Sequence, residues 1–269
     1  MALLQVNFFS QALGLSSSMN VILPEADQGI GAVPLNRGSA DPLERQTAQP
    51  EEQGPMPVLY LLHGLSDDHT IWGRRTSIER YVAGKRIAVV MPAVSKSFYS
   101  DEVNGMRYWE FISEELPAIV KTFFKVSDKR EDTYVAGLSM GSYGAAKLAL
   151  NYPERYSKAA MLSGGLTLMA SVIERPDFAS RIFGDASAFP GSCSDLAHVA
   201  RELAKSDRPK PAFFTASGKA DFIYDRHVES SKLLTELGFA VENYEEEGAS
   251  HEWSFWDKTI QMALEWMDF

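Results

Sequence analysis

The chain has one cysteine, Cys193, among its 269 residues, so no disulfide bond can form within it. A single thiol cannot supply the ligands of a cysteine-rich zinc site either. The sequence therefore predicts neither a disulfide-stabilised scaffold nor a metal centre of that kind. Such cysteine usage is typical of a reducing compartment.

Positive charge is in the minority. Lysine and arginine together number 26 against 36 aspartates and glutamates, which gives a net charge of −10 and a pI of about 5.1. An acidic surface repels the phosphates of nucleic acids and of anionic membranes. We therefore expect no nucleic-acid partner and no membrane partner.

Long hydrophobic runs are absent as well. No segment approaches the ~20 apolar residues that a membrane span needs. The first 20 residues lack a basic stretch followed by a long apolar run, so they do not resemble a signal peptide. Together with the cysteine usage, this predicts a cytoplasmic protein.

Apolar residues nevertheless make up 45% of the chain, enough for a sizeable core. Two short apolar runs, residues 3–9 and 19–23, flank a stretch that holds Gly14 and the serines at 16–18. This pattern predicts an antiparallel pair of strands at a sheet edge, with the turn at Gly14 and the serines.

Residues 24–57 differ in composition from the rest, because Pro, Gly, Gln, Asp and Glu dominate there. We interpret them as a long solvated loop inserted in a single domain that spans residues 1–269. A domain boundary is the weaker interpretation, since too little chain precedes the loop to form a domain.

Beyond the loop, buried strands and amphipathic helices alternate. Runs that are apolar throughout favour strands buried on both faces, as in parallel sheets. Alternation of this kind predicts a doubly wound α/β fold with right-handed crossovers. The expected strands are 57–62, 87–91, 133–136, 159–162, 211–216 and 240–244, and the expected helices are 111–124, 142–151, 226–237 and 253–267.

Residues 137–141 read Gly-Leu-Ser-Met-Gly between an expected strand and an expected helix. Strand, tight turn and helix are the context of a nucleophile elbow, in which the glycines leave room for a strained serine. We therefore predict that Ser139 is a nucleophile, beside the positive end of the helix dipole. A glycine-rich turn without chemistry is the alternative.

A serine nucleophile needs a base, which should be a histidine late in the chain. Among the five histidines only His251 follows the last expected strand. Its neighbours form a loop that enters the terminal helix, so the imidazole can reach the elbow. His198 and His227 belong to helical patterns and are expected to be solvated, and His63 precedes the serine and is expected to hold its loop by hydrogen bonds.

The third group must be a carboxylate that orients the imidazole. Asp221 follows the strand at 211–216 and a short turn, at the edge where doubly wound sheets present their loops. Asp225 competes, but it lies near the start of a helix, where an acid is expected for capping. We favour Asp221.

The tetrahedral intermediate of acyl transfer needs two preorganised N–H donors. One should be the amide of Met140, directly after the nucleophile, and the other should come from the loop after the strand at 57–62. The Leu65 amide is the best candidate there, with Gly64 allowing the backbone to approach the substrate carbonyl closely.

Four motifs now occur in one order: Leu-Leu-His-Gly-Leu-Ser at 61–66 with His69 and Trp72, Gly-Leu-Ser-Met-Gly-Ser-Tyr-Gly at 137–144, Gly-Lys-Ala-Asp-Phe at 218–222 and His-Glu-Trp at 251–253. Together they resemble the esterase D-like family of α/β-hydrolases, and most of all its tributyrin esterase and acetyl esterase branch. The resemblance covers nearly the whole chain. It implies the α/β-hydrolase fold, carboxylesterase activity on short acyl chains, and no metal or organic cofactor.

The substrate pocket is less readable. Residues 166–208 are expected to form a small cap that favours acetyl to butyryl groups, with ordinary surface helices as an equal alternative. Trp109 and Leu138 are expected to line the pocket together with Gly64. Trp253 joins them as a candidate, although core packing explains both tryptophans at least as well.

The expected reaction is hydrolysis of a small ester through an acyl-enzyme. Three alternatives stand beside it: an acetyl or feruloyl esterase acting on plant oligosaccharides, a thioesterase like S-formylglutathione hydrolase, and a non-catalytic binding protein on a hydrolase scaffold. S-formylglutathione hydrolases usually have histidine where this chain has Leu138. A homo-oligomer is compatible with the sequence, and the carboxyl runs at 114–115 and 245–247 are expected to be solvated.

Overall fold

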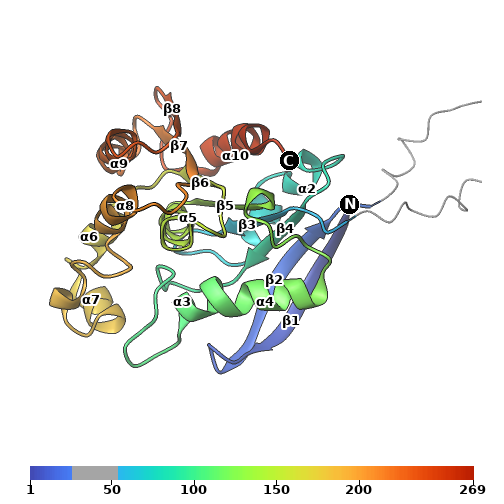
Figure 1. Cartoon of the computed structure of the whole chain (residues 1–269), viewed down its shortest axis with the longest axis horizontal. Helices are drawn as coiled ribbons and strands as arrows, with labels where there is room; N and C mark the ends of the chain where they lie inside the picture. Colours follow the sequence, from blue (N-terminus) through green and yellow to red (C-terminus); the bar gives the residue numbers. More distant parts are fainter. Residues whose placement is uncertain (26–53) are drawn as a thin grey trace, which may run out of the picture.

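The computed structural model describes residues 1–25 and 54–269, whose strands form one eight-stranded sheet in the order β1-β2-β4-β3-β5-β6-β7-β8 (Figure 1). Only the first two pairings from the β1 edge are antiparallel. From β4 to β8 every pairing is parallel, and each crossover carries at least one helix. The predicted α/β-hydrolase fold is confirmed.

The six strands that follow the amino-terminal pair match the predicted runs to within a few residues. Five of them are buried over nearly their whole length because helices cover both faces of the sheet, whereas the last, at the sheet edge, contains no buried residue. Since parallel strands point the same way, their carboxyl ends meet at one edge. The strands are β3 (Val58–Leu62), β4 (Ala88–Pro92), β5 (Thr133–Leu138), β6 (Lys158–Leu162), β7 (Ala212–Gly218) and β8 (Val241–Glu246).

The amino-terminal strands β1 (Ala2–Ser10) and β2 (Leu15–Leu23) form the predicted antiparallel pair at the sheet edge. The predicted turn is wrong in part. The serines at 16–18 are paired within β2, and the turn is confined to residues 11–14, where Gly14 has φ +67° and its N–H donates to the Ser10 carbonyl. One glycine with positive φ suffices to reverse the chain, so the serines are free to pair.

Helices cover the two faces of the sheet unequally. Short helices α1 (Ile71–Arg75) and α2 (Ile78–Tyr81) join the terminal helix α10 (Trp253–Met267) in one hydrophobic cluster. The larger cluster on the other face contains apolar residues of α5 (Met140–Asn151), α8 (Leu196–Ala204) and α9 (Tyr224–Glu236). Figure 1 shows α10 apart from α5 and α8, with the sheet strands between them.

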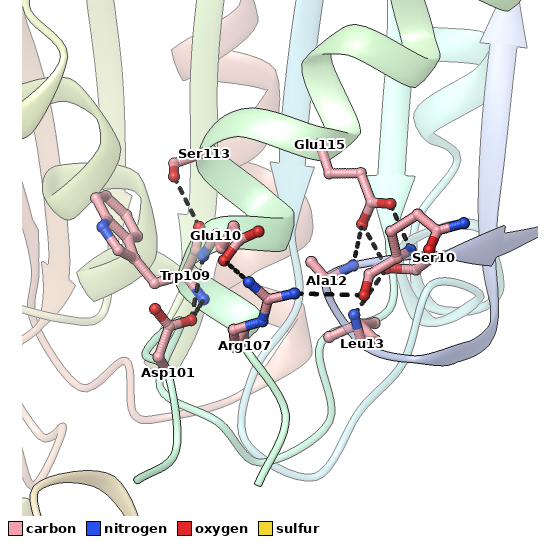
Figure 2. A network of polar contacts seen from close by, with 10 residues as sticks. Ser10, Ala12, Leu13, Asp101, Arg107, Trp109, Glu110, Ser113 and Glu115 are labelled. Atoms are coloured by element: carbon pink, nitrogen blue, oxygen red, sulfur yellow. Dashed lines mark hydrogen bonds and ion pairs between the residues drawn. The ribbon is translucent and has the colours of Figure 1, made fainter.

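The predicted helix at 111–124 is three consecutive pieces: α3 (Tyr108–Glu110), the π-helical turn η2 (Phe111–Glu115) and α4 (Leu116–Phe123). Figure 2 shows how polar contacts fasten its start. The Asp101 carboxylate accepts from the Trp109 and Glu110 amides at 2.8 and 3.1 Å, which satisfies two N–H groups of the first turn.

Glu115 was expected to be solvated, and that expectation is wrong. Its carboxylate accepts from the Ser10 hydroxyl and from the backbone N–H groups of Gln11 and Ala12 (Figure 2). These three donors belong to the turn between β1 and β2, which leaves amides without strand partners. Glu115 therefore ties the hairpin to the helix layer.

Residues 166–208 contain α6 (Leu168–Val172), α7 (Pro176–Ile182) and α8. The Phe178 ring of α7 packs edge-on against Phe98 at 5.7 Å, and Arg175 and Arg181 both lie over it. The segment thus packs on the loop after β4, and its role as a cap stays a prediction. The loop at 24–57 lies largely outside the described residues.

Candidate active site

The carboxyl end of β5 turns sharply into α5 at Ser139, which has φ +53° and ψ −117°. Such a backbone is strained for a residue with a Cβ, and it persists because its surroundings fix it. The Ser139 N–H donates to the Leu162 carbonyl of β6 at 2.8 Å. A Cβ on Gly137 would lie 2.4 Å from the Gly141 carbonyl, and a Cβ on Gly141 would lie 2.5 Å from the Leu62 oxygen. The turn requires both glycines.

Two loops at the same sheet edge are fastened to each other. They follow β7 and β8, which pair in parallel up to Gly218 and Glu246. The Ala220 N–H donates to the Ala249 carbonyl at 3.0 Å, and a Cβ on Gly218 would lie 2.1 Å from that oxygen. Close approach of the loops therefore needs glycine at 218, and it brings their next residues together.

Those next residues complete a chain of hydrogen bonds with the serine. His251 Nε2 lies 3.0 Å from Ser139 Oγ, and His251 Nδ1 lies 2.9 and 3.1 Å from the two Asp221 carboxylate oxygens. With Nδ1–H donating to the carboxylate, Nε2 is free to accept the serine proton. The Asp221 side chain is fully buried, whereas 19% of the His251 side chain is exposed. The structure thus brings the three predicted residues together.

Two opposing effects act on the pKa of Asp221. Burial raises it, whereas hydrogen bonds from His251 and from the Ile223 amide, together with the nearby His251 charge, lower it, and the net direction is downward. The carboxylate is therefore ionised at neutral pH, as an acceptor for the imidazole must be. Asp225 is exposed in the first turn of α9, and none of its recorded contacts is with the histidine.

The loop after β3 is held by a buried histidine, as predicted for His63. Val94 N–H donates to its Nε2 at 3.0 Å, so the ring proton is on Nδ1, which donates to the Gly64 carbonyl at 2.7 Å. Burial lowers the pKa of His63 to about 4, which keeps the ring neutral. The Tyr99 hydroxyl donates to the His63 carbonyl at 2.9 Å.

This loop stands next to the elbow. A Cβ on Gly64 would lie 2.8 Å from Leu138 Cδ1, so these two predicted pocket residues are neighbours. Within the described part of the chain, the Leu65 amide donates no recorded backbone hydrogen bond. The Met140 amide opens α5, where the first N–H groups have no acceptor within the helix. The assignment of these two amides to the oxyanion hole stays a prediction.

The two predicted pocket tryptophans pack in different places. Trp253 contacts Trp72 and Trp256 edge-on at 5.4 and 5.2 Å, close to His251 in the sequence. The ammonium nitrogen of Lys147, a residue in the second half of α5, lies over the Trp109 ring at 4.4 Å from the ring centroid. A pocket role stays a prediction for both.

His227 was expected to be solvated, and that expectation is wrong. Its side chain is 1% exposed, because the face of α9 that carries it packs against β7 and β8. Burial lowers its pKa, so the ring is neutral. His198 is exposed on α8, as expected.

The residues that hold the site were harder to find. Tyr99 fastens the loop after β3 and was not singled out, although it occurs in a Ser-Phe-Tyr-Ser run in the loop that follows a buried strand. Lys147 is buried in α5, and its only signal is a charge within a helix that is otherwise small or apolar. In residues 1–25 and 54–269 no cluster of three or more His, Cys, Asp or Glu side chains is placed to hold a metal ion.

Comparison with known proteins settles the family. The sequence model of the Esterase family matches residues 45–267. The chain belongs to this family, and it is a serine hydrolase of carboxylic esters. An acetyl esterase of Caldicellulosiruptor saccharolyticus is 29% identical over 99% of this chain and 98% of its own length. The enzyme interpretation therefore holds over that of a non-catalytic binding protein.

Solved structures agree. The fluorophosphonate-binding serine hydrolase FphF of Staphylococcus aureus superposes with a TM-score of 0.82 at 30% identity, covering 99% of this chain and 98% of that one. The S-formylglutathione hydrolase FrmB of the same organism gives 0.79 at 29% identity over the same shares. Across the described residues none of the helices has the length and apolar character of a membrane span.

Proposed function

We propose that the protein is a carboxylesterase that hydrolyses short-chain acyl esters, acetyl to butyryl, through a covalent intermediate on Ser139. The observation that carries the proposal is the continuous hydrogen-bond chain from Ser139 Oγ through His251 to Asp221 at the sheet edge. A nucleophile, a base and a group that orients the base are what acyl transfer requires.

In the proposed reaction Ser139 Oγ attacks the ester carbonyl while His251 takes its proton. Asp221 keeps the imidazole in the required tautomer and stabilises the imidazolium. The oxyanion binds to the amides of Leu65 and Met140. His251 then protonates the departing alcohol, and it later activates the water that releases the acid.

Two observations support a short acyl group. The chain is similar over its full length to a protein named acetyl esterase. In addition, two of the first three apolar residues after β6, Leu166 and Met169, are at most 1% exposed and pack in the same cluster as Met140, and the third, Leu168, is partly buried against that cluster. These side chains are used by the core, which supports a small acyl site.

The similarity to an S-formylglutathione hydrolase makes a thioester the second candidate substrate. Against it stands the acidic loop after β3, where the Asp67 N–H donates to the Gly64 carbonyl at 3.3 Å and Asp68 adds a second carboxyl group, because negative charge there disfavours the carboxylates of glutathione. We therefore propose a neutral ester as the substrate.

The test is hydrolysis of p-nitrophenyl esters from acetate to laurate, with S-formylglutathione measured beside them. We expect the highest kcat/KM between acetate and butyrate, a lower value for the thioester, and no activity in Ser139→Ala. A maximum at laurate would contradict the short acyl site. Substantial activity in Ser139→Ala would contradict the proposed nucleophile.

A further inference from the structure

Phe222 has the most exposed large hydrophobic side chain in the described part of the chain, with 80% of its surface accessible. Burying a phenyl ring is favourable, and the fold does not use this ring for that purpose. It directly follows Asp221, so the exposed ring belongs to the site rather than to a remote surface.

The Phe222 ring lies against the His251 imidazole, on a backbone that is hydrogen-bonded to Asp221. Its centroid lies 4.6 Å from that of the His251 imidazole, with 50° between the planes. The backbone on its carboxyl side is fastened to Asp221, because the Ile223 N–H donates to the carboxylate and the Tyr224 N–H donates to the carbonyl, both at 3.0 Å. Trp256 packs edge-on against the same imidazole at 4.9 Å. Phe222 therefore presents an apolar surface beside the base.

The chemistry decides which part of a substrate meets this surface. During acylation His251 Nε2 must protonate the alcohol oxygen, which places that oxygen within about 3 Å of Nε2. The acyl carbon is then bonded to Ser139 Oγ, and the carbonyl oxygen faces the amides of Leu65 and Met140. The substituent of the alcohol is the part left beside the imidazole, within reach of the phenyl ring.

We propose that Phe222 forms a leaving-group subsite, on which a neutral alcohol with a flat ring stacks during acylation. An aryl group and the C–H face of a pyranose share this chemistry, because both present a planar, carbon-bearing surface to the phenyl ring. The inference rests on the proposed function, since it presupposes that His251 protonates the alcohol.

The charges around the ring favour a neutral alcohol. Glu252 follows His251 and is exposed, and Glu247 is exposed on the same loop, where its carboxylate pairs with Lys219 at 2.6 Å. Lys219, three residues before Phe222, is thus already paired with a carboxylate, and the charge of Glu252 disfavours an anionic leaving group.

The test compares phenyl acetate with ethyl acetate, which share an acyl group and differ only in the alcohol. Phe222→Ala should lower the ratio of kcat/KM for phenyl acetate to kcat/KM for ethyl acetate about tenfold, the effect expected of one lost aromatic contact. Phe222→Trp should preserve the ratio, and Phe123→Ala, which removes an exposed ring from α4, should leave both values unchanged. Methyl xylopyranoside monoacetate provides the sugar arm, and a larger fall for it than for phenyl acetate would identify the pyranose as the preferred ring.

Three results would overturn the subsite. Phe222→Ala could lower both kcat/KM values by one common factor, which would mean that the ring only supports His251. The ratio in Phe222→Ala could instead stay at the wild-type value. Finally, the ratio in Phe222→Trp could fall as far as it does in Phe222→Ala. Failure of the proposed function looks different, because the wild-type protein would then hydrolyse none of the esters. Since kcat/KM reports only steps up to departure of the alcohol, a slower release of acetate does not affect it.

Discussion

Two polar clusters lie along helix α5, and they differ in what they leave open. At its amino end Ser139 meets His251, whose side chain is 19% exposed. Eight residues on, ~12 Å along the helix, the Lys147 ammonium donates to the Tyr99 carbonyl and to the hydroxyls of Ser100 and Ser194 at 2.9 to 3.0 Å. All three N–H groups of Lys147 are satisfied, and its side chain is 1% exposed.

The difference shows that burial and a shifted pKa do not by themselves make a group catalytic. Burial lowers the pKa of Lys147 to about 8, yet its ammonium is enclosed by fixed acceptors and by the Trp109 ring. Ser139 and His251, by contrast, lie where a substrate can reach them. We interpret the Lys147 cluster as a structural brace that joins α5 to the loops at 99–100 and 194.

We call Ser139, His251 and Asp221 the open cluster and Lys147 with its three acceptors the enclosed cluster. The largest expected effect concerns the Asp221 carboxylate of the open cluster. Asp221→Asn should lower kcat about 10⁴-fold, because an amide no longer holds the imidazole in the tautomer that accepts the serine proton. Asp225→Asn is the matched control and should change kcat less than about threefold, since it removes only one exposed acid from the first turn of α9. Steady-state kinetics on p-nitrophenyl acetate measure both, and equal losses would contradict the assignment of Asp221.

The opposite result is expected for the enclosed cluster. Lys147→Ala should lower the free energy of unfolding by about 2–4 kcal/mol, through the cavity and the acceptors left without a donor. Its kcat/KM should stay within about threefold of wild type, because the Lys147 ammonium donates to none of Ser139, Asp221 and His251. Urea unfolding and esterase assays on the same samples measure both quantities.

Two controls sharpen this prediction. Lys147→Met keeps most of the side-chain volume and should destabilise less than Lys147→Ala. Lys205→Ala removes an exposed lysine of a surface ion pair and should change the free energy of unfolding by less than about 1 kcal/mol. A Lys147→Ala protein of normal stability that has lost more than about 100-fold in kcat/KM would refute the structural role.

A smaller effect appears on acidification, through His63 beside the open cluster. Above pH 6.5, its ordinary pKa, the ring is neutral in the folded and the unfolded chain and does not change the free energy of unfolding. Between pH 6.5 and about 4 only the unfolded chain binds the proton, so the free energy of unfolding falls as the pH falls, by up to about 3 kcal/mol. The lowered pKa of His227 acts in the same direction.

His63→Asn removes this titration and should therefore show a shallower loss of stability from pH 7 to pH 4.5. His198→Asn replaces an exposed histidine and should keep the wild-type slope. The measurement is urea unfolding across that pH range. Identical slopes for His63→Asn and the wild-type protein would show that His63 is not the acid-sensitive group.

The contrast between these two clusters also explains which residues could be predicted from the sequence. Ser139, Asp221 and His251 each lie beyond the carboxyl end of a parallel strand, so chain order and a strand-end position were enough to select them. The Lys147 cluster draws its acceptors from residues 99–100 and 194, and no local pattern announces a contact across such separations. The prediction that His227 is solvated failed for a related reason, because the strands that bury it are brought to α9 only by the fold.

Local signals also failed where one residue overrode a pattern. Gly14 alone closes the turn between β1 and β2, so three serines that favour turns became part of a strand. Glu115 belongs to a pair of adjacent carboxylates that suggests a solvated face, yet the unpaired amides of that turn recruit it. In both places backbone groups that needed partners decided the outcome.

The most direct test of the account is where a fluorophosphonate attaches. Only an activated hydroxyl forms the covalent adduct rapidly, and we predict a single adduct on Ser139, found by peptide mass spectrometry and absent from Ser139→Ala. His251→Ala should slow labelling strongly, while Lys147→Ala, if folded, should label at nearly the wild-type rate. An adduct on another serine, or full esterase activity with Ser139 unlabelled, would contradict the account.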